Sequence, residues 1–315
     1  MKNKDTSYQQ ETNAIRAGYQ PTHENEHSEA LFLTSSYVFD SAEMAAQSFS
    51  NEIEGNVYSR YTNPTVRCFE RRLAMLEEGE QAVATSSGMA ATLAIIMALL
   101  ESGDHIICSR DVFGSTRVLM DQYIIKFGVE VSYVPLTNLS AWQDAVKTNT
   151  KMFFCETPSN PLSEIADLEG LSQIAKQADA LLVVDNCFCT PALQKPLKWG
   201  ADIVVHSATK YIDGQGRALG GAAVGSAQLM DQIQGFLRAA GPTMSPFNAW
   251  IFLKGLETLS LRMKAHSASA SALALWLSQH PKVSKVFFAG LADHPGHSLA
   301  KKQQTDFGAV VSFVV

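Results

Sequence analysis

The sequence predicts an α/β fold whose mainly parallel sheet is covered by helices on both faces. Between residues 81 and 225, short runs rich in β-branched residues alternate with stretches in which apolar residues recur at helical spacing. This alternation is typical of a parallel sheet between two layers of helices. Two runs, at 181–186 and 202–206, change abruptly from apolar to polar residues, as a strand buried on both faces does where it leaves the core.

The expected elements follow in chain order. Asn63 is a good N-cap and Pro64 a good first residue for a helix that continues to Gly79. A turn at 85–88 separates a short strand from the next helix. Ser245 favours the start of one long helix that runs to Met263. Further strands are expected at 105–109, 129–135, 151–156, 181–186 and 202–206, and further helices at 115–127, 140–146 and 168–179.

The chain divides into three expected parts. Residues 1–62 form a polar arm without clear periodicity, and such an arm is expected to contact a neighbouring subunit. Residues 63–245 form the large α/β domain. Residues 246–315 contain a bridging helix and the start of a smaller α+β domain. This domain is expected to be incomplete, because the chain stops at an apolar, strand-like run at 307–315.

The composition excludes several classes of partner and site. The 315 residues carry a net charge of −6 without a basic run, which argues against nucleic acid and anionic membranes as partners. No apolar stretch has the length of a membrane span, so a soluble, cytoplasmic protein is expected. Five scattered cysteines favour reduced thiols over disulfides. His294 and His297 lack further ligands nearby, so no metal site is expected.

Polar residues follow the two buried runs where each strand ends. Asp185 lies at the end of the first, and Ser207, Thr209 and Lys210 follow the second. Ligands of open α/β sheets bind beyond these strand ends. The set fits a site for pyridoxal 5'-phosphate (PLP), because a lysine amine forms a Schiff base with the cofactor's aldehyde and a carboxylate keeps its pyridine ring protonated. The alternative is a structural ion pair between Asp185 and Lys210.

A candidate phosphate site lies upstream, in the turn at 85–88. Ser87 and Gly88 come directly before the apolar helix that Met89 begins. The unpaired backbone N–H groups of a helix N-terminus bind anions, and glycine lets the backbone approach closely. A serine cap also occurs where no ligand binds. Together with Lys210 and Asp185, however, this turn predicts a complete PLP site.

Three further residues are candidates for the same pocket. Phe113 comes just after a strand, where its ring can stack on a planar cofactor or belong to the core. Asn160 stands between two prolines, where it can bond the cofactor's ring oxygen or form a rigid turn. Arg60 can grip a phosphate or be a solvated charge. The glycine-dense segment 213–223 lacks a dinucleotide-binding context and is expected to be mobile or packed closely under the site.

Five motifs occur together along the chain: Tyr58-Ser-Arg60, Ser86-Ser-Gly-Met89, Glu-Thr-Pro-Ser-Asn-Pro at 156–161, Val184-Asp-Asn186 and Ser207-Ala-Thr-Lys-Tyr211. In this order and approximate spacing, they resemble the Cys/Met-metabolism PLP enzymes, the family that contains cystathionine γ-synthase, cystathionine γ-lyase and methionine γ-lyase. The resemblance runs from about Thr12 to the last residue. Within the family, segments 112–116 and 241–250 look most like O-succinylhomoserine sulfhydrylases.

The resemblance implies the family's PLP-dependent transferase fold of aspartate aminotransferase type (fold type I) and a role for each matching residue. Lys210 would carry the Schiff base and move protons, and Asp185 would pair with the pyridine nitrogen. Phe113 would stack on the ring, where relatives usually have tyrosine, so proton transfer would shift toward Lys210. Tyr58 and Arg60 would reach the phosphate of a neighbouring subunit's cofactor, within a dimer of dimers. The remaining implied cofactor contacts are Ser87, Gly88, Met89, Asn160, Ser207 and Thr209.

The implied reaction is γ-replacement on an O-acylated homoserine, expected to be O-succinyl-L-homoserine, with sulfide to give L-homocysteine in methionine biosynthesis. Cysteine as the thiol would give cystathionine instead. In a γ-lyase, water rather than a thiol would react with the intermediate. Methionine γ-lyases typically carry a cysteine where this chain has Ser115, which argues against the lyase. A PLP-binding chain without catalysis is a further alternative, because the family's arginine for the substrate's α-carboxylate lies in the part of relatives beyond Val315.

Overall fold

The computed structural model describes residues 8–50 and 52–315, and its centre is a seven-stranded sheet of order β1-β7-β6-β5-β4-β2-β3. Strand β7 runs antiparallel to both of its neighbours, and the pairs between the strands from β6 to β3 are parallel. The predicted α/β fold with a mainly parallel sheet is therefore confirmed. The strands are β1 (Gln81–Thr85), β2 (His105–Ser109), β3 (Glu130–Val134), β4 (Thr150–Glu156), β5 (Leu181–Asp185), β6 (Ile203–Ser207) and β7 (Gly221–Gly225).

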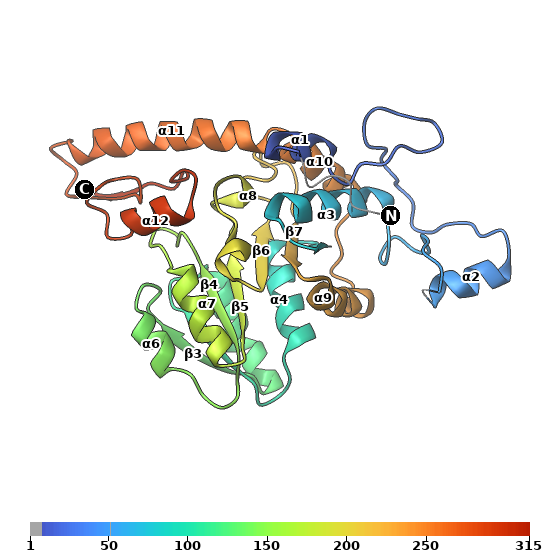
Figure 1. Ribbon diagram of the computed structural model, residues 1–315, viewed down its shortest axis with the longest axis horizontal. Helices are drawn as coiled ribbons and strands as arrows, with labels where there is room; N and C mark the ends of the chain where they lie inside the picture. Colours follow the sequence, from blue (N-terminus) through green and yellow to red (C-terminus); the bar gives the residue numbers. More distant parts are fainter. Residues whose placement is uncertain (1–7, 51) are drawn as a thin grey trace.

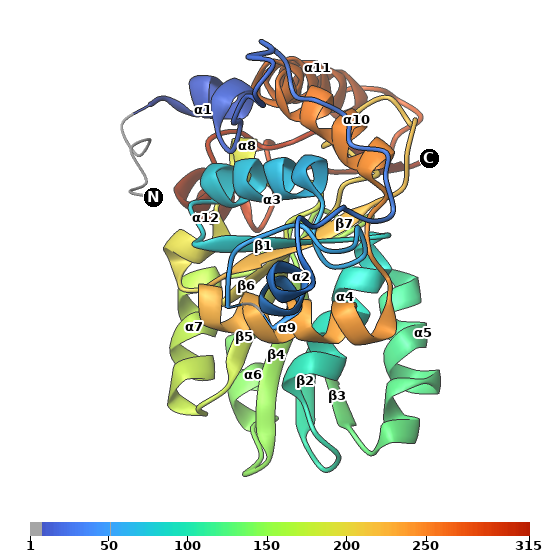
Figure 2. The ribbon, with the colours of Figure 1, turned by 90° about the vertical axis from the view of Figure 1, so that its right-hand side faces the viewer.

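Helices cover both faces of this sheet (Figure 1). One face packs against α4 (Gly88–Leu99), α5 (Gly114–Gln122) and α9 (Ala227–Ala240) through a shared apolar cluster. The other face packs against α3 (Pro64–Glu77), α6 (Leu139–Asp144), α7 (Leu168–Gln177), α8 (Thr190–Leu193) and α10 (Pro246–Leu256). Figure 2 shows α3 and α9 on opposite sides of β1 and β7. Burial on both faces explains why the central strands are almost wholly apolar.

The start of α3 follows the predicted capping chemistry. The Asn63 side chain accepts hydrogen bonds from the backbone N–H groups of Thr65 and Val66, and Pro64 is the first helical residue. Proline is favoured there because its missing N–H would have no intrahelical acceptor. The helix ends where Glu78 adopts a left-handed conformation with φ of 60°. The expected start and end of this helix are thus confirmed.

The single long helix expected from Ser245 to Met263 is two helices, α10 and α11 (Leu259–Ser278). The side chain of Arg262 explains the break, because it donates hydrogen bonds to the carbonyls of Gly255 at 2.8 Å and of Tyr211 at 2.7 Å. A guanidinium therefore satisfies a carbonyl that a continuous helix would pair with its own backbone. Ser245 lies at the N-cap position, but its side chain makes no capping hydrogen bond.

The glycine-dense segment after the expected lysine site ends in strand β7, which is buried along its whole length. Its glycines permit very close packing: a Cβ on Gly221 would lie 2.3 Å from the carbonyl oxygen of Ser87. Of the two expectations for this segment, close packing holds from Gly220 onward. Neither β7 nor the helix that follows it, α9, has a counterpart among the expected elements.

The C-terminal part contains a second, small sheet. Strands β8 (Lys285–Phe287) and β9 (Ser312–Val314) pair antiparallel, and α12 (His297–Gln303) lies between them in the chain. Of the apolar run at 307–315, expected to be strand-like, residues Ser312–Val314 form a strand. Two short 3-10 helices, η1 (Ile124–Phe127) and η2 (Pro196–Trp199), complete the large sheet's connections.

The N-terminal arm contains α1 (Gln10–Arg16) and α2 (Ala42–Phe49). Figure 1 shows α2 and its flanking loops set apart from the sheet. The division of the chain into parts at residues 62 and 245 stays a prediction. No helix in the described ranges is long and apolar enough to cross a membrane.

Candidate active site

The ends of three adjacent parallel strands form the floor of the candidate site. Glu156 ends β4, Asp185 ends β5 and Ser207 ends β6. Two residues earlier on each strand, Phe154, Val183 and Val205 belong to the apolar cluster on the α4 side of the sheet. Because side chains alternate along a strand, all three polar side chains at the ends point to that same side. The parallel topology therefore brings together residues up to 51 positions apart.

The N-terminus of α4 opens beside these strand ends. The Ser87 side chain accepts a hydrogen bond from the N–H of Ala90 at 3.1 Å, which leaves the earlier N–H groups of the helix without an intrahelical acceptor. A Cβ on Gly88 would lie 2.9 Å from Cβ of Ser207. Only glycine lets the backbone of α4 approach the end of β6 this closely. The next residue, Met89, accepts a hydrogen bond at its sulfur from Thr116 on α5, at 3.7 Å.

The lysine lies in the turn that follows β6. Its backbone N–H donates to the carbonyl of Ser207 at 3.2 Å, and its own carbonyl accepts from Gly214 at 2.8 Å, while its side chain is exposed. Thr209 exchanges two hydrogen bonds with the backbone of Gly220, at 3.2 and 3.3 Å. These bonds close the loop between the lysine turn and β7. Lys210 thus stands on a backbone that is held at both ends.

Cys187 connects the second and third strand ends. Its N–H donates to Oδ1 of Asp185 at 2.9 Å, and its thiol donates to the carbonyl of Ser207 at 3.6 Å. The charge of Lys210 lowers the pKa of this thiol slightly, although burial raises it far more. Asp185, Ser207 and Lys210 therefore share one small region of the structure.

Phe113 and Asn160 both contact Glu156, a residue that the sequence analysis did not assign to the site. The backbone N–H of Phe113 donates to Oε2 of Glu156 at 2.7 Å, and the backbone N–H of Asn160 also hydrogen-bonds to this carboxyl group. The Phe113 side chain is 49% exposed, so it is not an ordinary core residue. Asn160 is exposed as well, in a turn with two cis prolines, Pro158 and Pro161.

The two carboxyl groups at the strand ends have unusual acidities. Burial raises the pKa of Asp185 to about 6, against the opposing effects of the Cys187 N–H and of His206. Burial and the negative charge of Asp185 raise the pKa of Glu156 to about 8. Buried like charges disfavour each other's ionised form, so this pair holds a proton at neutral pH.

A buried polar network lies behind the site, on the α3 side of the sheet. Glu77 at the end of α3 contacts Nε2 of His206 at 2.6 Å and accepts from the side-chain amide of Asn186 at 2.9 Å. Gln194 donates to Asn186 at 3.1 Å and to the carbonyl of Thr157 at 3.0 Å. These bonds connect Thr157, Asn186 and His206. The first two directly follow Glu156 and Asp185, and the third directly precedes Ser207.

Tyr58 and Arg60 lie in the arm, and the described contacts of Arg60 are within this chain. Its guanidinium donates to the backbone carbonyl of Arg238 in the last turn of α9 and to the hydroxyl of Tyr61 at 3.2 Å. It also stacks over the rings of Tyr58 and Tyr61, with 5.6 and 4.6 Å to the ring centres. The structure therefore does not place these two residues with the strand-end group.

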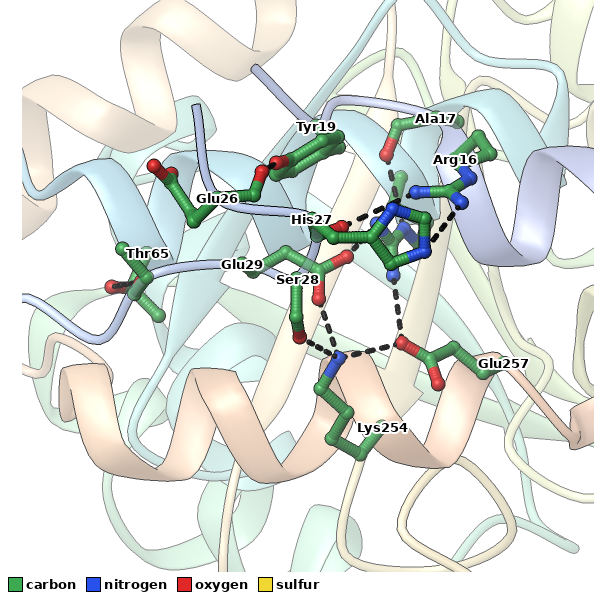
Figure 3. Close-up of polar contacts among 12 residues, drawn as sticks. Arg16, Ala17, Tyr19, Glu26, His27, Ser28, Glu29, Thr65, Lys254 and Glu257 are labelled. Atoms are coloured by element: carbon green, nitrogen blue, oxygen red, sulfur yellow. Dashed lines mark hydrogen bonds and ion pairs between the residues drawn. The ribbon is translucent and has the colours of Figure 1, made fainter. Parts of the chain in front are cut away.

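The arm is anchored by a partly buried ionic cluster, the arm cluster, formed by Glu29, Arg72, Lys254 and Glu257. Figure 3 shows Lys254 between Ser28, Glu29 and Glu257. Arg72 is fully buried, pairs with Glu29 and donates to the carbonyl of Ala17 at 3.0 Å. Burial opposes ionisation of Glu29, but the hydrogen bonds from Lys254 and Arg72 outweigh it and lower its pKa to about 2.

Sequence reasoning misses Glu156, Glu77 and His206. Glu156 had an available signal, because it is the last residue of an expected buried strand next to the one that ends at Asp185. Glu77 and His206 had none, because 129 positions separate them and only the packing of α3 on the sheet joins them. Among the described residues, no group of three or more His, Cys, Asp or Glu could hold a metal ion.

The residues at the strand ends fit PLP. The glycine-lined start of α4, with the hydroxyls of Ser207 and Thr209 beside it, offers a cradle for a phosphate that a Cβ on Gly88 would obstruct. Asp185 offers a carboxyl group, Phe113 an exposed ring and Lys210 an exposed amine. These are the donor, acceptor and stacking groups that the cofactor's phosphate, pyridine nitrogen, ring and aldehyde require.

Comparison with known proteins assigns the class. The family model described as Cys/Met metabolism PLP-dependent enzyme matches residues 11–315, so the chain belongs to this family, whose cofactor is PLP. An O-succinylhomoserine sulfhydrylase of Pseudomonas aeruginosa is 62% identical over 305 residues, which cover 97% of this chain and 76% of the relative. An L-methionine gamma-lyase of Pseudomonas putida is 39% identical over 308 residues, covering 96% and 77%.

A solved structure matches the whole fold. The crystal structure of MetB from Corynebacterium glutamicum superposes with a TM-score of 0.93 at 35% sequence identity, over 98% of this chain and 78% of that one. The fold-type-I architecture expected from the family resemblance is therefore confirmed.

Proposed function

We propose that this chain is an O-succinylhomoserine sulfhydrylase, which replaces the succinyloxy group on the γ-carbon of O-succinyl-L-homoserine by sulfide and forms L-homocysteine and succinate. The observation that carries the proposal is the 62% identity over 97% of the chain to the Pseudomonas aeruginosa enzyme of that name. A second enzyme of the same name, from Mycobacterium tuberculosis, is 44% identical over 96% of the chain. The product places the reaction in methionine biosynthesis.

Lys210 is the proposed catalytic base. When bound, PLP withdraws electrons from the carbon skeleton of the amino acid and makes its α-hydrogen acidic. With substrate and cofactor bound, the Lys210 amine would accept the proton from the α-carbon, pass it to the cofactor, and then accept one from the β-carbon; both protons would return to the carbon skeleton after sulfide has added. Loss of the β-proton lets the acylated γ-oxygen leave as succinate, and sulfide then adds to the γ-carbon. Phe113 carries no hydroxyl, so proton transfer falls to Lys210.

The other strand-end residues orient the cofactor. Asp185 pairs with the pyridine nitrogen, and Phe113 stacks on the ring. The N–H groups of Gly88 and Met89 hold the phosphate, together with Ser87, Ser207 and Thr209, and Asn160 bonds the ring oxygen. The packing of Gly88 on Ser207 and the bonding of Thr209 to Gly220 support these roles, because they hold the donors at one place.

Tyr58 and Arg60 are proposed to complete the site of a neighbouring copy. Tyr58 is 40% exposed and contacts Arg60 within the N-terminal arm, which supports this role. The active form is then at least a dimer, and a dimer of dimers in the full assembly. We place it in the cytoplasm, where the five free, buried cysteines stay reduced.

Spectroscopy with product analysis tests the proposal. The purified chain should show the visible absorption band of bound PLP, and should form homocysteine from O-succinyl-L-homoserine only when sulfide is present. Lys210→Ala, the matched control, should lose the band and the product. Cystathionine formed from cysteine with better kcat/KM would favour the synthase, and a keto acid formed without thiol would favour the γ-lyase. Bound PLP without turnover would contradict an active enzyme.

A further inference from the structure

Glu156 lies at the junction of three segments of the candidate site. Its side chain is only 3% exposed, although it is a carboxyl group at the end of a strand. It accepts the N–H of Phe113 at 2.7 Å and that of Asn160, and its partner in the β4 and β5 register is Asp185. One buried side chain therefore adjoins the three residues proposed to touch the cofactor's ring.

The geometry places the carboxyl groups of Glu156 and Asp185 next to each other. Neighbouring strands lie about 4.8 Å apart, and register partners of parallel strands point to the same side. The backbone N–H of Cys187 supports the carboxyl of Asp185, and the N–H groups of Phe113 and Asn160 support that of Glu156. Two buried negative charges at this separation repel each other, so one carboxyl group keeps its proton.

The surroundings indicate which of the two is neutral. His206 lies near Asp185 and favours its ionised form, and Lys210, the proposed reactive amine, lies near the adjacent residue Cys187. Glu156 has the Asp185 charge beside it, and the pKa of Glu156 is the higher of the two. The other titratable groups beside the pair are the thiols of Cys108, Cys155 and Cys187, whose pKa values burial raises, so that they too are neutral.

We propose that Glu156 is a positioning residue that works in its neutral form: it holds Phe113 and Asn160 against the cofactor's ring and leaves Asp185 as the carboxylate for the pyridine nitrogen. The inference rests on the proposed function for the roles of these three neighbours. A neutral carboxyl group still accepts both backbone N–H groups. Without a negative charge of its own, it does not compete with Asp185 for the protonated ring.

Two substitutions separate the hydrogen bonds of Glu156 from its charge. Glu156→Gln keeps an oxygen that accepts the N–H of Phe113 but cannot ionise, and Glu156→Ala removes the acceptor. PLP is titrated into the apoprotein and followed by its visible absorption and circular dichroism. The glutamine variant should bind PLP within about threefold of the parent, and the alanine variant at least about tenfold more weakly and with a reduced dichroic band, because buried N–H groups lose their acceptor. Glu164→Gln, in the loop after β4, is the matched control.

The charge state has a second readout that needs no cofactor. A folded-state pKa above the unfolded one means that the folded chain binds more protons between about pH 4.3 and its raised pKa, so stability falls as pH rises through this window. Glu156→Gln removes this contribution. The melting temperature of its apoprotein relative to the parent should therefore rise steadily from pH 5 to pH 8.5, whereas Glu164→Gln should show a smaller rise, since its pKa is raised less.

Each outcome decides the proposal. A glutamine variant as weak in PLP binding as the alanine variant would show that Glu156 acts as an anion. An alanine variant that binds PLP like the parent would remove the positioning role, and a relative melting temperature independent of pH would contradict the neutral form. A parent chain that binds PLP but makes no homocysteine overturns the proposed function and leaves these measurements intact. A parent chain that binds no PLP overturns both.

Discussion

The strand-end site and the arm cluster both bury carboxyl groups, but the surroundings move their acidities in opposite directions. Burial raises the pKa of Asp185 and Glu156, which receive backbone N–H groups and lie beside each other. Glu29 is also buried, yet its pKa falls to about 2, because Lys254 and Arg72 both bond to it. Burial alone therefore does not set the charge of a carboxyl group, and the partners decide it.

Under the proposed function, this difference distinguishes a buried acid that serves a ligand from one that stabilises the fold. In the arm cluster, the charges of Glu29 and Glu257 are met by those of Arg72 and Lys254. At the strand ends, the carboxyl group of Asp185 accepts the N–H of Cys187, and it forms no salt bridge with any cation in residues 8–50 and 52–315. Perturbed acids of this kind are concentrated at functional sites, where a ligand supplies the missing charge. The protonated ring of PLP is such a ligand.

The largest effect is expected from a substitution of Asp185, the buried acid without a paired cation among the described residues. Asp185→Asn keeps the shape of the side chain but removes the charge for the pyridine nitrogen. Turnover of O-succinyl-L-homoserine should fall on the order of 10²-fold to 10³-fold, the range found when one electrostatic contact of a transition state is removed. The visible band should show that PLP is still bound. Near-normal turnover would contradict the role of Asp185, and Asp202→Asn, at the opposite end of the sheet, is the matched control.

The second prediction tests whether Glu29 stabilises the fold through its ion pairs. Glu29→Gln removes the carboxylate that hydrogen-bonds to the fully buried Arg72 and leaves it, among the described carboxylates, only the longer contact with Glu257 at 3.9 Å; breaking such a pair costs about 3 kcal/mol of unfolding free energy. Chemical denaturation of the apoprotein measures this loss, with the exposed arm residue Glu24→Gln as control. Because the folded pKa is lowered, the contribution of Glu29 is present above its unfolded pKa of about 4.3 and is lost as pH falls toward 2. An equal stability difference at pH 2.5 and pH 7 would contradict this assignment.

The smallest effect concerns the arm's proposed link to a neighbouring site. Arg60→Ala should weaken PLP retention about tenfold, since a hydrogen bond to a charged group contributes about 1.5 kcal/mol or more. Dialysis followed by cofactor absorbance measures the retention, and Arg16→Ala, an exposed arginine of the same arm, should leave it unchanged. Unchanged retention in Arg60→Ala would support the alternative that Arg60 serves only the contacts with Tyr61 and Arg238 seen within this chain.

Local signals in the sequence were sufficient for six of the seven strands of the sheet and for a set of candidate site residues, but not for β7, which lies at the end of the glycine-dense segment. The polar residues at strand ends, Asp185 and Ser207 among them, could be assigned because abrupt apolar-to-polar changes mark where a buried parallel strand leaves the core. Gly88 and Ser87 could be assigned because a helix start has its own capping chemistry. The family resemblance then supplied roles for Asn160 and for Tyr58 and Arg60, which local patterns left open.

The sequence by itself determined the fold class and the PLP family and supplied the candidate residues for the cofactor, whose roles stay a prediction, because periodicity, caps and motifs act over a few neighbouring residues. Only the tertiary structure decided which distant groups meet. The pairing of β4 with β5 placed Glu156 beside Asp185, and the packing of α3 on the sheet joined Glu77 to His206. The charge of a buried carboxyl group depends on such neighbours across the fold, and no local pattern specifies them.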